Sequence, residues 1–67
     1  MKLHINGENV EVPSSISFVT ELLAHFQLEE KVVIVELNHD ILEKENHART
    51  NISDGDRIEI VHFVGGG

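Results

Sequence analysis

Three consecutive glycines at the end of the chain, Gly65, Gly66 and Gly67, are the residues best suited to chemistry. They directly follow residues 57–64, an apolar run with the composition of a β-strand. Ordering glycine costs more backbone entropy than ordering any other residue, and glycine has no side chain to bury, so this triplet adds nothing to a core. It does give a thin segment that fits a narrow channel on a partner. The reactive group there would be the α-carboxylate of Gly67.

Two simpler explanations of a glycine-rich end stand beside this one. Terminal glycines also occur as frayed chain ends and as remnants of a cloned linker. The glycines alone do not separate these explanations, so the rest of the chain has to decide.

Histidine and acidic side chains are the other groups that could do chemistry. The five histidines fall in different predicted elements, without the close ligand pair that a zinc site usually contains: His4, His25, His39, His47 and His62. The acidic residues are equally dispersed, and no serine or glycine-rich loop matches a nucleophile elbow or a phosphate cradle. We expect no metal site, and we do not expect the chain to be an enzyme in its own right.

Composition narrows the class of protein. A chain of 67 residues with 40% hydrophobic residues fits one small packed domain, and without cysteine it has no disulfide or thiolate metal site. A formal net charge of −7 disfavours nucleic acid and favours partners with basic docking surfaces. No apolar run is long enough to span a membrane and no secretory signal is present, so we expect a cytoplasmic protein with no membrane partner.

Residue patterns then predict the elements that carry the glycines. Residues 2–5 and 9–12 alternate between apolar and polar, and Asn6 and Gly7 between them form the strongest short hairpin signal. Apolar residues at helical spacing predict a helix over residues 18–27. Three serines before it are candidates for its N-cap: Ser14, Ser15 and Ser17.

The second half of the chain reads as strands. A β-branched run predicts a strand at 32–37, a turn follows at 38–40, and Ile41 with Leu42 suggests a short further strand. Residues 43–51 are polar, with room for one helical turn, and residues 57–64 predict the last strand. The order of elements predicts an α+β, β-grasp (ubiquitin-like) fold with a mixed sheet of four to five strands and one packed helix. We expect one domain over residues 1–64 and a flexible tail at 65–67.

An exposed apolar patch is predicted on the sheet face away from the helix. If Val33, Val35 and Leu37 point toward the helix, alternation turns their neighbours outward, and the last strand behaves in the same way. Such patches often mark protein–protein contacts. The residues predicted to bind a partner are Ile34, Val61, Phe63 and Val64, with Val32 beside them.

Over its whole length the chain resembles the ThiS family of sulfur carrier proteins. The resemblance is carried by the ending at residues 54–67, by the strand at 32–38 and by the hairpin turn Ile5, Asn6, Gly7. The ending is its most specific part. Many members have a proline or tryptophan in the segment matching residues 43–50, and this chain has neither.

The resemblance implies a role in thiamine biosynthesis. An adenylyltransferase (ThiF-like) would use ATP and magnesium to activate the Gly67 carboxylate, while Gly65 and Gly66 give access. Sulfur from a cysteine desulfurase would convert Gly67 into a thiocarboxylate, and a thiazole synthase (ThiG-like) would take the sulfur for the thiazole ring. The chain itself would bind no cofactor and would act as a protein cosubstrate.

Three alternatives remain open at this stage. The small subunit of molybdopterin synthase shares the fold and the glycine ending, but tends to be longer, with proline before the glycines. A ubiquitin-like modifier or binding module would use only the sheet patch. An accessory β-grasp domain with an engineered ending would continue beyond Gly67 in the native gene.

Overall fold

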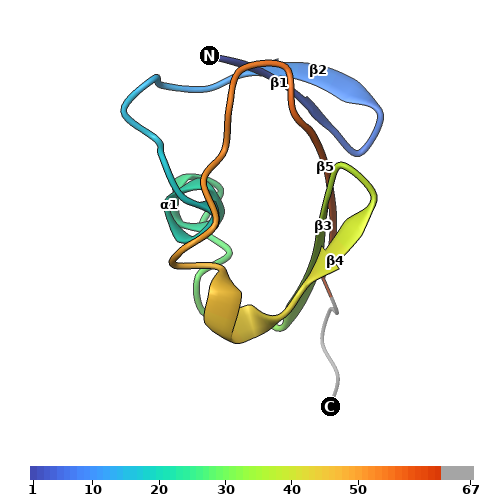
Figure 1. Ribbon diagram of the computed structural model, residues 1–67. Helices are drawn as coiled ribbons and strands as arrows, with labels where there is room; N and C mark the ends of the chain where they lie inside the picture. The colour runs from blue at the N-terminus through green and yellow to red at the C-terminus, as the bar shows by residue number, and fades with distance from the viewer. Residues whose placement is uncertain (63–67) are drawn as a thin grey trace.

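The computed structural model describes residues 1–62, which form a mixed sheet with one α-helix on one side of it (Figure 1). The strands are β1 Lys2–Ile5, β2 Glu8–Glu11, β3 Val33–Leu37, β4 Asp40–Leu42 and β5 Arg57–His62, and the helix is α1 Val19–His25. The sheet order is β2-β1-β5-β3-β4. Strands β1 and β5 pair in parallel and the other neighbours are antiparallel. This is the predicted mixed sheet with one packed helix, and its first and last strands lie side by side at the centre.

Both hairpins in the sheet turn through two residues with positive φ. Between β1 and β2 these are Asn6 at φ 50° and Gly7 at φ 83°, and between β3 and β4 they are Asn38 at 49° and His39 at 74°. Positive φ at both central residues is the geometry of the type I′ turn, whose twist matches that of the flanking strands. Of the four residues only Gly7 adopts this conformation without a steric cost.

The hydrophobic core lies between α1 and the inner face of the sheet. Strands β1 and β5 alternate as the pattern requires, so that Leu3 and Ile5 of β1 and Ile58 and Ile60 of β5 are buried while their neighbours are exposed. The core is completed by residues of the helix, of β3 and of the connecting segments: Val12, Ile16, Val19, Leu22, Leu23, Val35 and Ile52. Within residues 1–62, no helix has the length and apolar character needed to cross a membrane.

Helix α1 begins at Val19, and the prediction that a serine caps it is wrong. Phe18 occupies the N-cap position and gives no side-chain hydrogen bond. The free N–H groups are satisfied from elsewhere: Oε1 of Glu21 accepts from the Phe18 amide, and the amides of Val19 and Thr20 donate to carbonyls in the segment before β5. Those carbonyls belong to Thr50 and His47, at 3.1 and 3.2 Å.

The helix also ends two residues earlier than predicted. Gln27 takes a left-handed conformation at φ 61°, which stops the helix although the apolar stripe continues to Phe26. The Leu28 amide donates to the Leu23 carbonyl at 2.8 Å, and the Gln27 amide donates to the Ala24 carbonyl at 3.0 Å. This pair of bonds is the Schellman motif, which uses the last free carbonyls of the helix.

The remaining boundaries agree closely with the sequence prediction. Strand β3 starts one residue later than expected, β4 contains the short strand predicted at Ile41 and Leu42, and residues Lys44–Asn46 form a single 3-10 turn. Strand β5 is described as far as His62. Phe63 and Val64, the predicted domain end at residue 64 and the predicted tail at 65–67 all lie outside the described residues.

Candidate functional site

Strand β5 is the element that leads to the glycines, and it is held from both sides. It lies between β1 and β3, and its pairing with β3 runs from Leu37 opposite Ile58 to Val33 opposite His62. Ile58 and Ile60 anchor it in the core. The predicted reactive residue Gly67 and the predicted access residues Gly65 and Gly66 follow this strand, beyond the described residues.

The side chain of Asn6 holds the second half of β5, where β1 has already turned away. Its Nδ2 donates to the Ile60 carbonyl at 3.0 Å, and its Oδ1 accepts from the Ile60 amide at 2.8 Å. The side-chain amide therefore replaces one residue of the missing strand. Sequence reasoning identified Asn6 only as a turn residue, because nothing in the local pattern signals a partner 54 positions away.

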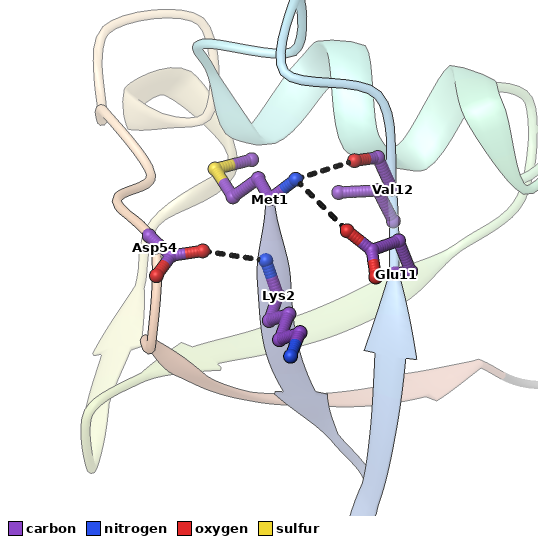
Figure 2. A network of polar contacts seen from close by, with 5 residues as sticks. All are labelled: Met1, Lys2, Glu11, Val12 and Asp54. Carbon is purple, nitrogen blue, oxygen red and sulfur yellow. Dashed lines mark hydrogen bonds and ion pairs between the residues drawn. The ribbon is translucent and has the colours of Figure 1, made fainter.

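The start of β5 is fixed to β1 through the turn that precedes it (Figure 2). The Lys2 amide donates to Oδ1 of Asp54 at 2.6 Å, and the Gly55 amide donates back to the Lys2 carbonyl at 2.7 Å. On the other side of β1, the α-ammonium of Met1 donates to the Val12 carbonyl at 3.0 Å. The two bonds of Lys2 fix the start of β5 in the parallel register that places His4 opposite Arg57.

The outer face of the sheet carries the predicted apolar patch as far as the structure describes it. Ile34 and Val61 lie directly opposite each other on β3 and β5, with 43% and 53% of their surfaces exposed. Val32 and Ile41 are exposed still further. The predicted direction of the side chains is confirmed for Val32, Ile34 and Val61, while their role in binding a partner stays a prediction. Ile41 is not part of the predicted patch. Phe63 and Val64, the other predicted members, lie outside the described residues.

The histidines do not gather into a metal site in the described part of the chain. His4 lies opposite Arg57, whereas His62 lies five residues further along β5, so the pairing of the end strands does not bring them together. No group of three or more His, Cys, Asp or Glu side chains within residues 1–62 is placed to hold a metal ion. His47 is buried, and its Nε2 has no hydrogen-bond partner among these residues.

Almost none of the charged groups within residues 1–62 forms an ion pair. The one ion pair in residues 1–62 joins the α-ammonium of Met1 to Oε2 of Glu11 at 3.5 Å (Figure 2). The acidic surface is therefore free to interact with a basic partner. What the geometry offers is a sheet that presents an exposed face and whose strand β5 leads, in sequence, to the glycines.

Comparison with known proteins decides between the alternatives. A model of the ThiS family matches residues 3–67. The chain belongs to the ThiS family. It is 48% identical to the sulfur carrier protein ThiS of Bacillus subtilis over 65 residues, which are 97% of this chain and 98% of that protein.

Two further relatives extend this result. The crystal structure of the thiamine biosynthesis protein ThiS from Geobacter metallireducens superposes with a TM-score of 0.82 at 40% identity, covering 100% of both chains. A thiazole synthase from Paramagnetospirillum magneticum is 42% identical over 67 residues, which are 100% of this chain and 20% of that protein. The β-grasp fold and the resemblance inferred from the sequence are thereby confirmed.

Proposed function

We propose that this chain is a sulfur carrier protein of thiamine biosynthesis, and that the carboxylate of Gly67 carries the sulfur as a thiocarboxylate. The observation that supports it best is the full-length similarity to the ThiS sulfur carrier of Bacillus subtilis, in a chain that ends in three glycines. A ubiquitin-like module that used only its sheet face would have no need of that ending.

The chemistry of this cycle belongs to partner enzymes. The Gly67 carboxylate attacks the α-phosphorus of ATP in an adenylyltransferase, pyrophosphate leaves, and magnesium neutralises the phosphate charge. A persulfide derived from cysteine by a desulfurase attacks the acyl-adenylate, and AMP leaves. A thiol then cleaves the sulfur–sulfur bond and is itself oxidised to a disulfide, which leaves the thiocarboxylate on Gly67.

In this scheme the chain is a cosubstrate and not an enzyme, and positioning is its contribution. The carboxyl carbon has to reach a phosphate inside another protein's active site, and correct placement of reacting groups supplies much of the rate enhancement. Gly65 and Gly66 bring no side chain into that channel. Strand β5, held between β1 and β3, gives the ending a fixed starting point.

The proposed partners follow from the same scheme. Ile34 and Val61 on the sheet, with Phe63 and Val64 after it, dock on the adenylyltransferase. A thiazole synthase accepts the sulfur, and the segment similar to this chain within the Paramagnetospirillum thiazole synthase supports that pairing. All of these steps take place in the cytoplasm.

The decisive experiment is the intact mass of the protein after incubation with ATP, magnesium, the cognate adenylyltransferase, cysteine and a cysteine desulfurase. We expect one oxygen to be replaced by sulfur, at Gly67, and no change when ATP is omitted or when Gly66 and Gly67 are deleted. An unchanged mass with active partners would overturn the proposal and favour a binding module.

A further inference from the structure

The outer face of the sheet carries a pattern that the apolar patch does not explain. Strands β4, β3 and β5 lie side by side there, away from α1 (Figure 1). In one row across them Ile41 lies opposite Glu36, and Glu36 lies opposite Glu59. In the next row Ile34 lies opposite Val61. Two carboxylates therefore stand together among three exposed aliphatic side chains.

The position of the two carboxylates works against folding. Residues directly opposite each other in an antiparallel pair have their Cβ atoms about 4.5–5.5 Å apart, and like charges in such a pair are destabilising. No lysine or arginine within residues 1–62 forms an ion pair with Glu36 or Glu59. Arg57, two residues before Glu59 on the same face of β5, is also without one in this part of the chain.

The aliphatic neighbours show that this face is available for contact. Ile34 is 43% exposed, Val61 53% and Ile41 70%. The two glutamates alone would not define a site, but a partner that covered the aliphatic side chains would also remove both carboxylates from water. Burying a charge without a counter-charge is strongly unfavourable. The partner therefore has to bring positive charge to this place.

A second copy of the chain meets that requirement poorly. Two such faces brought together would gather four carboxylates against two copies of Arg57, in a protein whose net charge is already −7. The like-charged pair thus disfavours self-association of the exposed face while it favours a basic partner. Because these carboxylates have no ion-pair partner within residues 1–62, a partner surface of opposite charge covers this face more favourably than a neutral or acidic one.

We propose that Glu36 and Glu59 receive an arginine or lysine side chain from an enzyme surface whose surrounding apolar groups cover Ile34, Val61 and Ile41. This inference rests on the proposed function, because it takes that enzyme to be the adenylyltransferase. It adds the chemistry of the partner's docking surface: a basic side chain at the centre with apolar groups around it. Arginine suits the site best, since its planar guanidinium can bond two carboxylates at once.

The test compares two double variants of equal charge. Glu36→Gln with Glu59→Gln removes both carboxylates from the face and keeps side-chain size. Glu43→Gln with Glu45→Gln removes two exposed carboxylates at the 3-10 turn, outside the sheet. Calorimetric titration of each into the cognate adenylyltransferase, at low salt and at about 0.5 M salt, gives Kd. Thermal unfolding shows that each is folded.

We expect the face variant to bind roughly tenfold more weakly than the control variant at low salt, with a smaller difference at high salt. We also expect it to be at least as stable as the wild type, because the repulsion is gone. Equal affinity of the two variants at both salt concentrations would overturn the inference. The sulfur loading of the wild type is measured alongside: if it loads and the variants bind alike, only this inference fails, and if it does not load, the proposed function fails.

Discussion

At the scale of single residues, Asn6 has two roles, one in the hairpin turn and one in holding β5. Its backbone has a φ of 50°, which glycine also adopts readily. Its side chain forms hydrogen bonds with both the backbone N–H and the carbonyl of Ile60. We expect Asn6→Gly to keep the turn and lose both bonds, which lowers the free energy of unfolding by about 1–3 kcal/mol. Urea unfolding measures this loss.

Hydrogen exchange locates the effect of the same substitution. The Ile60 amide should exchange markedly faster in Asn6→Gly, because the group that accepts its hydrogen bond is absent, whereas the Ile58 carbonyl still pairs with the backbone of residue 6. A variant as stable as the wild type, with Ile60 equally protected, would show that the side-chain amide does not hold the strand.

Glu21, at the start of the helix, makes a contribution to folding stability that depends on pH. Its Oε1 accepts hydrogen bonds from the amides of Ser17 and Phe18, both at 2.8 Å, and these bonds hold the pKa of the Glu21 carboxyl below its ordinary value of 4.5. Because the pKa is lower in the folded chain than in the unfolded one, the carboxylate stabilises the fold above pH 4.5. That contribution disappears as the pH falls through the folded-state pKa.

The variant Glu21→Gln isolates this contribution. We expect it to be less stable than the wild type at neutral pH, and to lose less stability than the wild type on acidification to about pH 3. Glu29→Gln, which changes an exposed carboxyl in the loop after α1, is the control for the loss of one negative charge. Urea unfolding across this pH range makes the comparison, and identical curves for both variants would contradict the assignment.

At the scale of elements, the second turn position of the second hairpin carries strain that glycine avoids at the same position of the first. His39 sits at φ 74°, a left-handed conformation that costs a residue with a side chain about 1–2 kcal/mol. We expect His39→Gly to stabilise the fold by about 1 kcal/mol, which would raise the midpoint of thermal unfolding by roughly 4–8 °C in a domain of this size. Thermal unfolding followed by circular dichroism gives the shift.

The neighbouring position provides the control for this prediction. Asn38 also has positive φ, but its Oδ1 accepts from the Arg57 amide at 3.0 Å and its Nδ2 donates to Oδ1 of Asp56 at 3.1 Å. Asn38→Gly should therefore destabilise the fold although glycine suits the backbone. If His39→Gly lowered the midpoint as Asn38→Gly should, backbone strain at His39 would not be the deciding factor.

The sequence predicted the elements well because their types follow from local periodicity. The alternation of apolar and polar residues in β1 and β5, together with the Asn-Gly pair, directly predicted strands of the sheet. The prediction failed at the ends of α1, where distant or unusual partners decide. The amides of the first turn are satisfied by carbonyls about thirty residues later, and Gln27 ends the helix in a conformation that glycine normally takes.

The candidate site could be predicted from sequence only in part. The alternation of β3 and β5 correctly turned Ile34 and Val61 outward, because one face of each strand had to meet the helix. The hydrogen bonds between the Asn6 side chain and Ile60, and the pairing of Glu36 opposite Glu59, depend on the register between strands far apart in the chain. Register is a tertiary property, and no local pattern in these segments encodes it.

At the scale of the whole molecule, the proposed function divides the chain into a folded part that docks and an ending that reacts. Within residues 1–62 the core residues run from Leu3 to Ile60, all before the glycines in sequence. Substitution of Gly66 by valine should therefore leave the midpoint of thermal unfolding unchanged. The same change puts a branched side chain into the partner's channel, and we expect it to abolish sulfur loading in the intact-mass assay.

A graded series makes this separation of stability from reactivity quantitative. Gly66→Ala adds one methyl group and should slow sulfur loading, whereas Gly66→Val should block it. Both variants should have the same midpoint of thermal unfolding as the wild type. Asn6→Gly is the opposite case, since it weakens the fold but leaves the ending unaltered, and its loading should approach that of the wild type at temperatures where it is folded. A fall in melting temperature with Gly66→Val would mean that the division between docking and reacting parts is wrong. Normal loading of that variant would mean that the ending does not enter a narrow channel.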